Sequence, residues 1–342
     1  MSIVEYIQRN EKIYEGITKV NYFYMPPVTQ SEKLVIIFSG FNGREGQGKS
    51  PTYNYVKVFN QIDAHRLFIL DSYEGHPCYY LGKNQQVDYE LATMSLIYDQ
   101  MKKLNVRRSN VVTTGSSKGG TAALYFALKY DLGTTVVGGF QSYVGSYLRE
   151  VNFYARERVL KLITGGINDS HEKYLNDYYH YFFENVKYNN TNIYVHGGSG
   201  DPHYLNHVVP VLNIFNRRNI PYSLDIKEYH SHAEIGEHFS QFLFETIPVV
   251  TNTLYINQVE IKYENNHLVC TPSLPNGSHF ENGVKYAYYI YSSKSKNPIK
   301  KFGYSNNGSI EYKILENGDY RVKVFVMNSN HKTSKMSKYI TI

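Results

Sequence analysis

Continuous runs of β-branched and aromatic residues, separated by segments with helical periodicity, constrain this chain more than any other feature. KLVIIFSG (33–40), NVVTTG (110–115) and TTVVGGF (134–140) are continuous rather than alternating, which is typical of strands buried on both faces. Between residues 87 and 104, apolar side chains recur at spacings of three and four, as in an amphipathic helix. This alternation predicts an α/β fold, with a mostly parallel sheet covered by helices on both faces.

The alternation covers residues 1–248 with one interruption. Residues 142–188 have the pattern of two aromatic-rich helices, and we expect a helical lid inserted over the end of the sheet. After Pro248 the chain changes to short period-two runs separated by turn signals such as NNGS and ENGD. The number of these runs predicts a second domain at 249–342, an immunoglobulin- or fibronectin-like β-sandwich with Tyr320 as its tyrosine corner.

Composition narrows the classes of function. The 342 residues, 42% of them hydrophobic, suit two domains with buried cores. A net charge of +6 is spread along the chain without a dense basic stripe, so we expect no nucleic-acid binding. Two distant cysteines exclude a disulfide scaffold, and no apolar run is long enough for a transmembrane segment. We recognise no signal peptide in the sequence and therefore expect a cytoplasmic protein, with peripheral attachment to a membrane as an alternative.

The stretch GSSKGG (115–120) lies between a predicted buried strand and a predicted helix. It fits the G-x-S-x-G nucleophile elbow, in which a tight turn pushes Ser117 out over the sheet edge. Gly115 and Gly119 are required there because side chains would collide with the turn. A P-loop does not fit, because the lysine precedes the glycines, and no G-x-G-x-x-G fingerprint occurs. Ser117 is therefore the predicted nucleophile.

The partners of a nucleophilic serine follow it in the order acid, then histidine. Asp201 and His232 each follow a predicted strand, so both are expected at the carboxyl edge of the sheet. We expect His232 to act as general base and Asp201 to hold its tautomer. His230 is the alternative base and Glu234 a weaker acid, while Asp201 could instead cap the next helix.

Two backbone N–H groups should stabilise the negative charge that develops on the acyl oxygen. One belongs to Lys118, directly after the nucleophile, and the other to Phe41 in the loop after the 33–38 strand. The side chain of Asn42 could add a donor, and we include it among the substrate-binding candidates.

Several histidines are candidate ligands of a metal ion, because their spacing also occurs in zinc sites. They lie near Glu234 in the predicted fold and are His203, His207, His230 and His238. No H-E-x-x-H motif occurs, and we expect no bound metal.

Four stretches carry a resemblance: FSGFNG, ILDSYEGHPCYYLGKNQQVDYE, TTGSSKGGTAALYFALKY and HSHAEIGEHF. They resemble the XcbB/CpsF-type capsular polysaccharide biosynthesis family and the accessory Sec component that O-acetylates sugars on serine-rich adhesins, both α/β-hydrolase relatives. The resemblance implies serine acyl-enzyme chemistry on glycans, with Ser117 as nucleophile and His232 as base. The acid is less defined, because members can carry Glu where this chain has Asp201. An acyl donor such as acetyl-CoA would supply the group that is transferred.

The same resemblance implies a sugar or lid contact for the loop at 71–84, through Asp71, Tyr79, Tyr80, Lys83 and Asn84. From its position alone, Asp71 could equally cap the turn after its strand. The predicted function is an esterase or O-acyltransferase on a cell-surface or capsular polysaccharide, with no resident cofactor. A non-catalytic scaffold in a glycan or secretion assembly is the alternative, and a peptidase is a third. The C-terminal domain would bind glycan, a protein partner or a second subunit.

Overall fold

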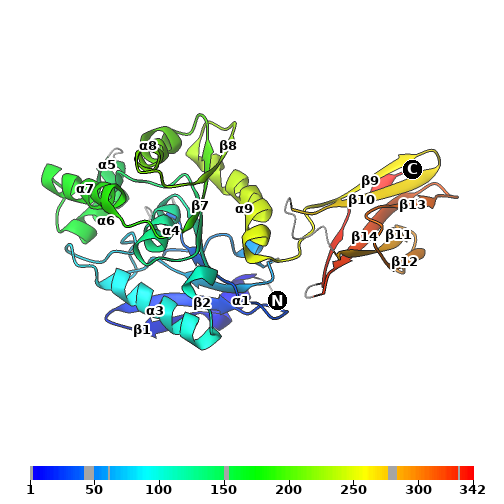
Figure 1. Ribbon diagram of the computed structural model, residues 1–342, viewed down its shortest axis with the longest axis horizontal. Helices are drawn as coiled ribbons and strands as arrows, with labels where there is room; N and C mark the ends of the chain where they lie inside the picture. The colour runs from blue at the N-terminus through cyan, green and yellow to red at the C-terminus, as the bar shows by residue number, and fades with distance from the viewer. Residues whose placement is uncertain (1–2, 42–49, 61, 150–153, 276–282, 330–331) are drawn as a thin grey trace. The chain divides into compact units, whose positions relative to one another are not determined.

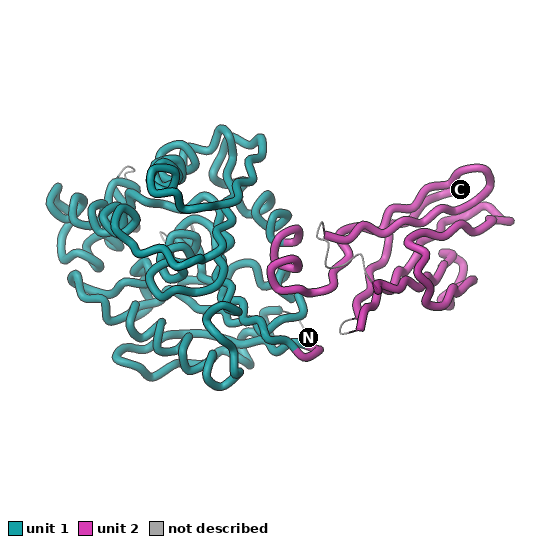
Figure 2. Tube along the Cα trace, viewed as in Figure 1, with its two compact units in different colours: residues 1–27, 31–243 teal, residues 28–30, 244–342 magenta. Residues whose placement is uncertain are grey.

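The computed structural model describes residues 3–41, 50–60, 62–149, 154–275, 283–329 and 332–342 (Figure 1). The chain forms two compact units, the first comprising 1–27 and 31–243 and the second 28–30 and 244–342 (Figure 2). The domain boundary predicted after residue 248 lies inside helix α9 (Ile235–Thr251), whose last residues belong to the second unit. Pro248 therefore lies within a helix, although the change of sequence pattern does begin just beyond it.

An eight-stranded sheet forms the centre of the first unit, in the order β1-β2-β4-β3-β5-β6-β7-β8. The strands from β4 to β8 run parallel, and β1 and β2 are antiparallel additions at one edge. Every residue of β3, β5 and β6 is buried, which confirms the prediction from the continuous apolar runs. The strands are β1 (Lys12–Glu15), β2 (Lys19–Met25), β3 (Leu34–Phe38), β4 (His65–Ile69), β5 (Val111–Ser116), β6 (Thr134–Gly138), β7 (Asn192–Gly198) and β8 (Ser223–Lys227).

Helices cover the sheet on both faces. One face of β3 packs into a core cluster with α3 (Asp88–Leu104), α4 (Lys118–Lys129) and α8 (Val209–Arg217). Successive residues of a strand point to opposite faces, so the buried Val35 and Ile37 of β3 face the other side. The prediction of a mostly parallel sheet covered by helices is confirmed.

Three helices separate β6 from β7, within the predicted insertion. They are α5 (Val144–Arg149), α6 (Tyr154–Thr164) and α7 (Asp169–Asn185). The buried carboxylate of Glu90 in α3 ties α7 to the main core, because it accepts hydrogen bonds from Tyr178 of α7 at 3.3 Å and from Tyr125 of α4 at 3.0 Å. A buried acceptor with several donors fixes the elements that supply them.

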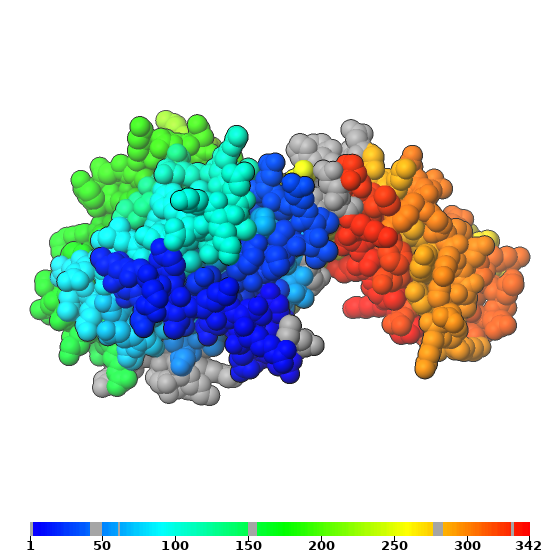
Figure 3. Space-filling view, turned by 90° about the horizontal axis from the view of Figure 1, so that it is seen from below, coloured from blue at the N-terminus to red at the C-terminus, as the bar shows by residue number. Residues whose placement is uncertain are grey.

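The N-terminal residues add elements that the sequence pattern did not predict. Helix α1 (Ile3–Asn10) contacts β2, and the Tyr14 hydroxyl of β1 donates to Asp99 of α3 at 2.9 Å. In Figure 3 these residues, in dark blue, lie at the surface beside the cyan α3 segment. A short helix α2 (Val56–Phe59) follows β3. In the parts of the chain that the structure describes, no helix is both long enough and apolar enough to cross a membrane.

The second unit contains only antiparallel strand pairs among its described residues, in a three-stranded and a five-stranded sheet. Both sheets contribute to one buried cluster that includes Leu268 of β10 and Val322 of β14. The Tyr320 hydroxyl donates to the Glu316 carbonyl at 2.7 Å, the upstream backbone bond of a tyrosine corner. An immunoglobulin- or fibronectin-like sandwich stays a prediction. The strands are β9 (Gln258–Glu264), β10 (His267–Ser273), β11 (Lys285–Ser292), β12 (Lys300–Ser305), β13 (Ile310–Lys313), β14 (Asp319–Met327), β15 (Lys332–Met336) and β16 (Ile340–Thr341).

Candidate active site

Ser117 lies on a strained turn between β5 and α4. Its φ of 53° and ψ of −128° are unfavourable for a residue with a side chain, and its N–H donates to the Gly138 carbonyl at 2.9 Å. A Cβ on Gly119 would lie 2.4 Å from the Phe38 carbonyl oxygen, and one on Gly115 would lie 2.5 Å from the Gly119 backbone. The predicted need for glycine on both sides of the nucleophile is therefore confirmed.

His232 and Asp201 meet at the carboxyl edge of the sheet. The His232 Nδ1 atom lies 3.0 Å from Oδ2 of Asp201, and the carboxylate is fully buried. A capping box turns the chain before His232: Ser231 accepts from the Ala233 N–H, and Glu234 accepts from the Ser231 N–H. Glu234, the weaker candidate for the acid, is thus occupied in shaping the loop.

The alternative base, His230, lies on a different side of the acid loop. A Cβ on Gly200 would fall 2.0 Å from Nδ1 of His230, so its imidazole packs against the backbone of Gly200. The structure pairs His232, and not His230, with Asp201. Asp201 also accepts from the His203 N–H at 2.9 Å, so the helix-capping role considered for it coexists with its contact to His232.

The electrostatics of Asp201 favour an ionised acid. Burial on its own would raise its pKa, but hydrogen bonds from His203 and His232 hold the pKa of this carboxyl well below its usual range. A carboxylate can only accept, so the Nδ1 atom of His232 carries the hydrogen, and in the neutral imidazole Nε2 then carries the lone pair. Nε2 of His232 is buried and has no partner among the described residues. This is the tautomer that a general base requires.

The base lies next to the elbow. The Gly138 carbonyl accepts the hydrogen bond from the Ser117 N–H. A Cβ on the next residue, Gly139, would lie 3.2 Å from Cε1 of His232. Its φ of +47° is a conformation that a side chain disfavours, and the space beside it is taken by the imidazole. Ser117 and His232 thus contact the consecutive residues Gly138 and Gly139.

Gln141 is a site residue that the sequence analysis missed. Its Nε2 donates to Oγ of Ser117 at 2.7 Å, and its side chain is fully buried. Its backbone is anchored to the helix after the elbow, because its N–H donates to Oγ1 of Thr121 at 2.9 Å. A polar residue just beyond the end of β6, the strand next to the elbow, was the available signal. In this structure the Gln141 amide, and not the His232 imidazole, binds the Ser117 hydroxyl.

The two predicted oxyanion donors come from neighbouring parallel strands, because β3 pairs with β5. Lys118 is the first residue of α4, where an N–H has no acceptor within the helix. Phe41 lies just beyond β3 and is half-buried against the core. Their role in stabilising an oxyanion stays a prediction, and Asn42 lies outside the described residues.

Three predicted sugar contacts face the interior. The Asp71 carboxylate accepts backbone N–H groups from Cys78 at 3.0 Å, Tyr79 at 2.9 Å and Tyr80 at 3.2 Å. To present these groups, Tyr79 and Tyr80 adopt φ values of 54° and 57°. Asp71, Tyr79 and Tyr80 are all buried. The sugar contact expected from the resemblance remains a prediction, whereas the contacts present here are structural.

A buried ion pair joins this loop to the nucleophile helix. Nζ of Lys118 lies 2.7 Å from Oδ2 of Asp71, and both side chains are fully buried. The Asp71 N–H donates to Oγ of Ser39 at 3.0 Å, and the Tyr80 hydroxyl receives the Ser39 N–H at 2.6 Å. These bonds connect the segment after β3 with the start of α4, the two places where the predicted oxyanion donors lie.

A second imidazole stacks on that of His232. The rings of His203 and His232 are 3.4 Å apart at their centroids and inclined by 15°. One polar atom each from Asp201, His203 and His232 lies within 4.8 Å of the others, which is compact enough for an ion. Imidazole binds metals through lone pairs in the ring plane, and two nearly parallel planes cannot both contain one ion. A shared metal would therefore require one ring to turn.

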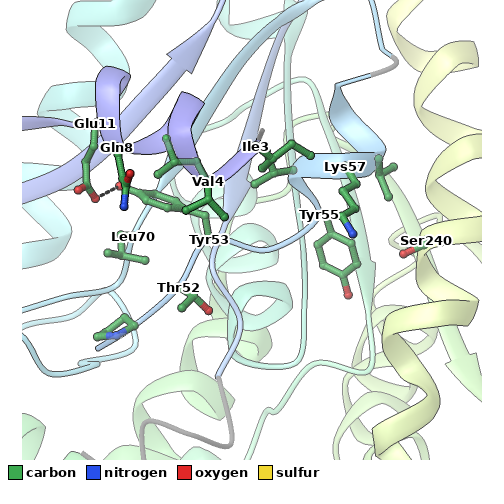
Figure 4. Close-up of a pocket in the computed structure, with 14 residues that line it drawn as sticks. Ile3, Val4, Gln8, Glu11, Thr52, Tyr53, Tyr55, Lys57, Leu70 and Ser240 are labelled. Carbon is green, nitrogen blue, oxygen red and sulfur yellow. Dashed lines mark hydrogen bonds between the residues drawn. The ribbon is translucent and has the colours of Figure 1, made fainter. Parts of the chain in front are cut away.

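A separate cavity of about 750 Å³ lies between α1 and the segment around α2 (Figure 4). Its wall is mainly apolar, with Ile3 and Val4 of α1 on one side. At one end Tyr55, Lys57 and Ser240 lie near one another in the figure. The Tyr55 hydroxyl also forms a hydrogen bond with Oγ of Ser116, the residue before the nucleophile. Tyr55 thus lines the cavity and also contacts the residue before Ser117.

Fold and site together define an α/β-hydrolase-like protein with a serine on a nucleophile elbow and a histidine–carboxylate pair beside it. No known protein-family model matches the chain. An accessory Sec system protein of Staphylococcus aureus is 23% identical over 244 residues, covering 69% of this chain and 43% of that protein. The chain therefore spans less than half the length of this curated relative.

Two solved structures are similar in fold. The capsule O-acetyltransferase of Neisseria meningitidis serogroup A aligns with a TM-score of 0.56 and 23% identity over 67% of this chain and 90% of that one. A chain of the Glycosylation Associate Protein complex from Streptococcus agalactiae aligns with a TM-score of 0.57 and 17% identity, over 70% of this chain and 46% of that one. The resemblance expected from the sequence, to an accessory Sec component and to capsule proteins of this fold, is confirmed.

Proposed function

We propose that the protein transfers or removes acyl groups on a cell-surface or capsular polysaccharide through an acyl-enzyme on Ser117. The observation that carries this proposal is the pairing of His232 with a buried, ionised Asp201 beside a strained nucleophile elbow. A serine hydroxyl is a weak nucleophile until a correctly oriented base takes its proton. The order of the three residues along the chain is that of α/β-hydrolases.

The chemistry needs two half-reactions. In the first, Oγ of Ser117 bonds to the acyl carbon, its proton passes to Nε2 of His232, and the leaving group departs with that proton. In the second, a sugar hydroxyl or water gives its proton to Nε2 and bonds to the same carbon, and Oγ leaves and recovers the proton. The N–H groups of Lys118 and Phe41 would hold the oxyanion in both steps, a contribution of about 10²–10³ in rate for one donor.

The substrate class is supported by the names of the similar proteins. The Neisseria enzyme is a capsule O-acetyltransferase, and a variant of it has been solved in complex with coenzyme A. We extend this to a polysaccharide acceptor and an acetyl donor such as acetyl-CoA. The apolar cavity beside Tyr55 is a suitable place for the non-reacting part of the donor, because Tyr55 also contacts Ser116 and the cavity has a volume in the range of small-ligand sites.

The experiment is labelling with a fluorophosphonate, which reacts with activated serines. Wild-type protein should be labelled, and Ser117→Ala should not. Ser116→Ala is the matched control, because it removes the neighbouring hydroxyl and leaves the nucleophile; its labelling should persist. Labelling of Ser117→Ala, or none of the wild type, would contradict the proposal.

The second candidate function is a scaffold without catalysis. It is favoured by two of the similar proteins, an accessory Sec system protein and a chain of a glycosylation-associated complex. We propose that the C-terminal unit, as a β-sandwich, binds a protein partner or glycan in such an assembly in the cytoplasm, and that α5 to α7 act as the lid. A wild type that resists the fluorophosphonate but binds its partner would favour this function.

A further inference from the structure

His203 shares the acid of the proposed base. The Asp201 carboxylate offers one oxygen to each ring: Oδ2 lies 3.0 Å from Nδ1 of His232, and Oδ1 lies 3.4 Å from Nδ1 of His203. The backbone N–H of His203 binds the same Oδ1 at 2.9 Å. Both rings therefore turn their Nδ1 edges toward a single anion.

The local backbone explains why His203 is held there. His203 directly precedes a π-helical turn, Tyr204–Val208, and its ring stacks on that of His232. Such turns are uncommon and occur frequently at functional sites. No other imidazole in the described chain is bound to the carboxylate that serves the base.

The stacking fixes where the remaining nitrogens lie. The two rings are nearly parallel with centroids 3.4 Å apart, and both Nδ1 atoms face Asp201. In an imidazole ring, the Nε2 atom points away from the group that the Nδ1 atom binds. Both Nε2 atoms therefore lie on the side away from the carboxylate, separated by roughly the stacking distance. Both are buried, and neither has a partner among the described residues.

Each Nε2 is an acceptor. Because a carboxylate only accepts, it favours the tautomer of each ring with hydrogen on Nδ1 and the lone pair on Nε2. Leaving a buried acceptor unpartnered is unfavourable, and a bound donor would relieve this. Two acceptors at this spacing match two hydroxyl groups on adjacent carbons of a sugar ring, whose oxygens in the gauche arrangement are separated by a similar short distance.

We propose that His203 is an acceptor-binding residue that, with His232, recognises a vicinal diol. This inference rests on the proposed function and names the acceptor's chemical class. The attacking hydroxyl donates to Nε2 of His232, and its neighbour donates to Nε2 of His203. Whatever movement admits an acceptor to the base admits it to His203 as well, because the two nitrogens are adjacent.

The surroundings of His203 suit a sugar. The Tyr147 ring of α5 lies edge-on to it, with centroids 5.2 Å apart. Tyr147 is itself covered by the Arg156 guanidinium of α6, at 4.1 Å from the ring centroid. Aromatic rings provide apolar contact for the faces of a sugar ring, and hydrogen bonds specify its hydroxyls.

In the step proposed, atoms balance without any further reactant. The attacking oxygen bonds to the acyl carbon, its proton passes to Nε2 of His232, the bond from Oγ of Ser117 to the acyl carbon breaks, and Oγ takes the proton. The second hydroxyl keeps its proton throughout and only donates a hydrogen bond to His203. His203 thus orients the acceptor and takes no proton in the reaction.

The test measures how the acyl-enzyme divides between acceptors. p-Nitrophenyl acetate supplies the acetyl group, and the acceptors are ethylene glycol, which is a vicinal diol, and ethanol, which is not. Wild type should transfer to ethylene glycol about tenfold better per hydroxyl than to ethanol, the worth of one hydrogen bond. His203→Phe retains an aromatic ring for stacking and should lose this preference, as should His203→Gln.

His207→Gln is the matched control, because it removes the neighbouring imidazole without touching Asp201, and it should keep the preference. Fluorophosphonate labelling of each variant at close to the wild-type rate shows that the fold and Ser117 remain intact. An unchanged preference in both His203 variants, or none in wild type, overturns the inference. Absence of any p-nitrophenolate release by wild type instead overturns the proposed function itself.

Discussion

The buried ion pair between Lys118 and Asp71 allows the sharpest prediction of stability. Both side chains are fully buried at a separation of 2.7 Å, and the carboxylate also receives three backbone N–H groups. Removing one partner of such a pair typically costs about 3–5 kcal/mol, because the other charge stays buried. Lys118→Met should lower the free energy of unfolding by about 3 kcal/mol, because the backbone N–H groups still solvate the carboxylate.

Asp71→Asn should lower the free energy of unfolding further, by about 5 kcal/mol. The Lys118 ammonium would lose its carboxylate, and the new amide would turn its NH₂ group toward backbone donors that need an acceptor. The double variant should be less destabilised than the sum of the two single variants by about 2 kcal/mol, because both charges are then absent. A matched surface control is Lys173→Met, which breaks an exposed pair with Asp177 and should cost less than about 0.5 kcal/mol.

The assay is chemical denaturation followed by the helical circular dichroism of the chain. Apart from the end of α9, the described helices belong to the first unit, so this signal reports the unit that contains the pair. If both single variants cost less than about 1 kcal/mol and add in the double variant, the ion pair does not hold this region together and our reasoning is wrong.

Three further predictions concern the site. Gln141→Met should slow fluorophosphonate labelling about tenfold while costing about 1–2 kcal/mol, because one buried hydrogen bond to Oγ of Ser117 is lost; a faster reaction would contradict this. Burial, and then the neighbouring His203 and His232, lower the pKa of His207 from 6.5 to about 4. As the pH falls, the unfolded chain therefore takes up a proton at His207 before the folded chain does. Between about pH 6.5 and pH 4, the free energy of unfolding of wild type should fall by about 3 kcal/mol more than that of His207→Gln. Denaturation at each pH measures this, and equal losses would refute it. Val4→Trp should partly fill the cavity of Figure 4 and raise the KM for acetyl-CoA severalfold without changing labelling by a small fluorophosphonate, whereas an unchanged KM would place the donor elsewhere.

Much of the central sheet could be predicted because its strands are buried on both faces. Continuous runs such as 33–40 leave few alternatives to a core strand, and the glycines around Ser117 could only suit a tight turn. The positions of His232 and Asp201 could also be predicted, because the carboxyl ends of parallel strands gather at one edge of the sheet. Local pattern and tertiary position agree at these residues.

Other features depend on contacts that no local pattern encodes. Gln141 and His203 stand out because Gln141 binds Oγ of Ser117 from beyond the end of β6 and because the His203 ring stacks on that of His232. For Asp71, the resemblance implies a sugar contact and its position a turn-capping role; in the structure the chain at 78–80 donates three N–H groups to its carboxylate. Helix α9 continues through Pro248, because tertiary packing outweighs the loss of one backbone donor.

The most direct test of the central claim is the mass of the intact chain after brief mixing with p-nitrophenyl acetate and an acid quench. We expect one added acetyl group, located by fragmentation on Ser117, present in Ser116→Ala and absent from Ser117→Ala. The adduct should also be absent, or form at least about a hundredfold more slowly, in His232→Ala, because the hydroxyl then lacks its base. An acetyl group on another residue, or equal acetylation without His232, would contradict an acyl-enzyme built from these three side chains.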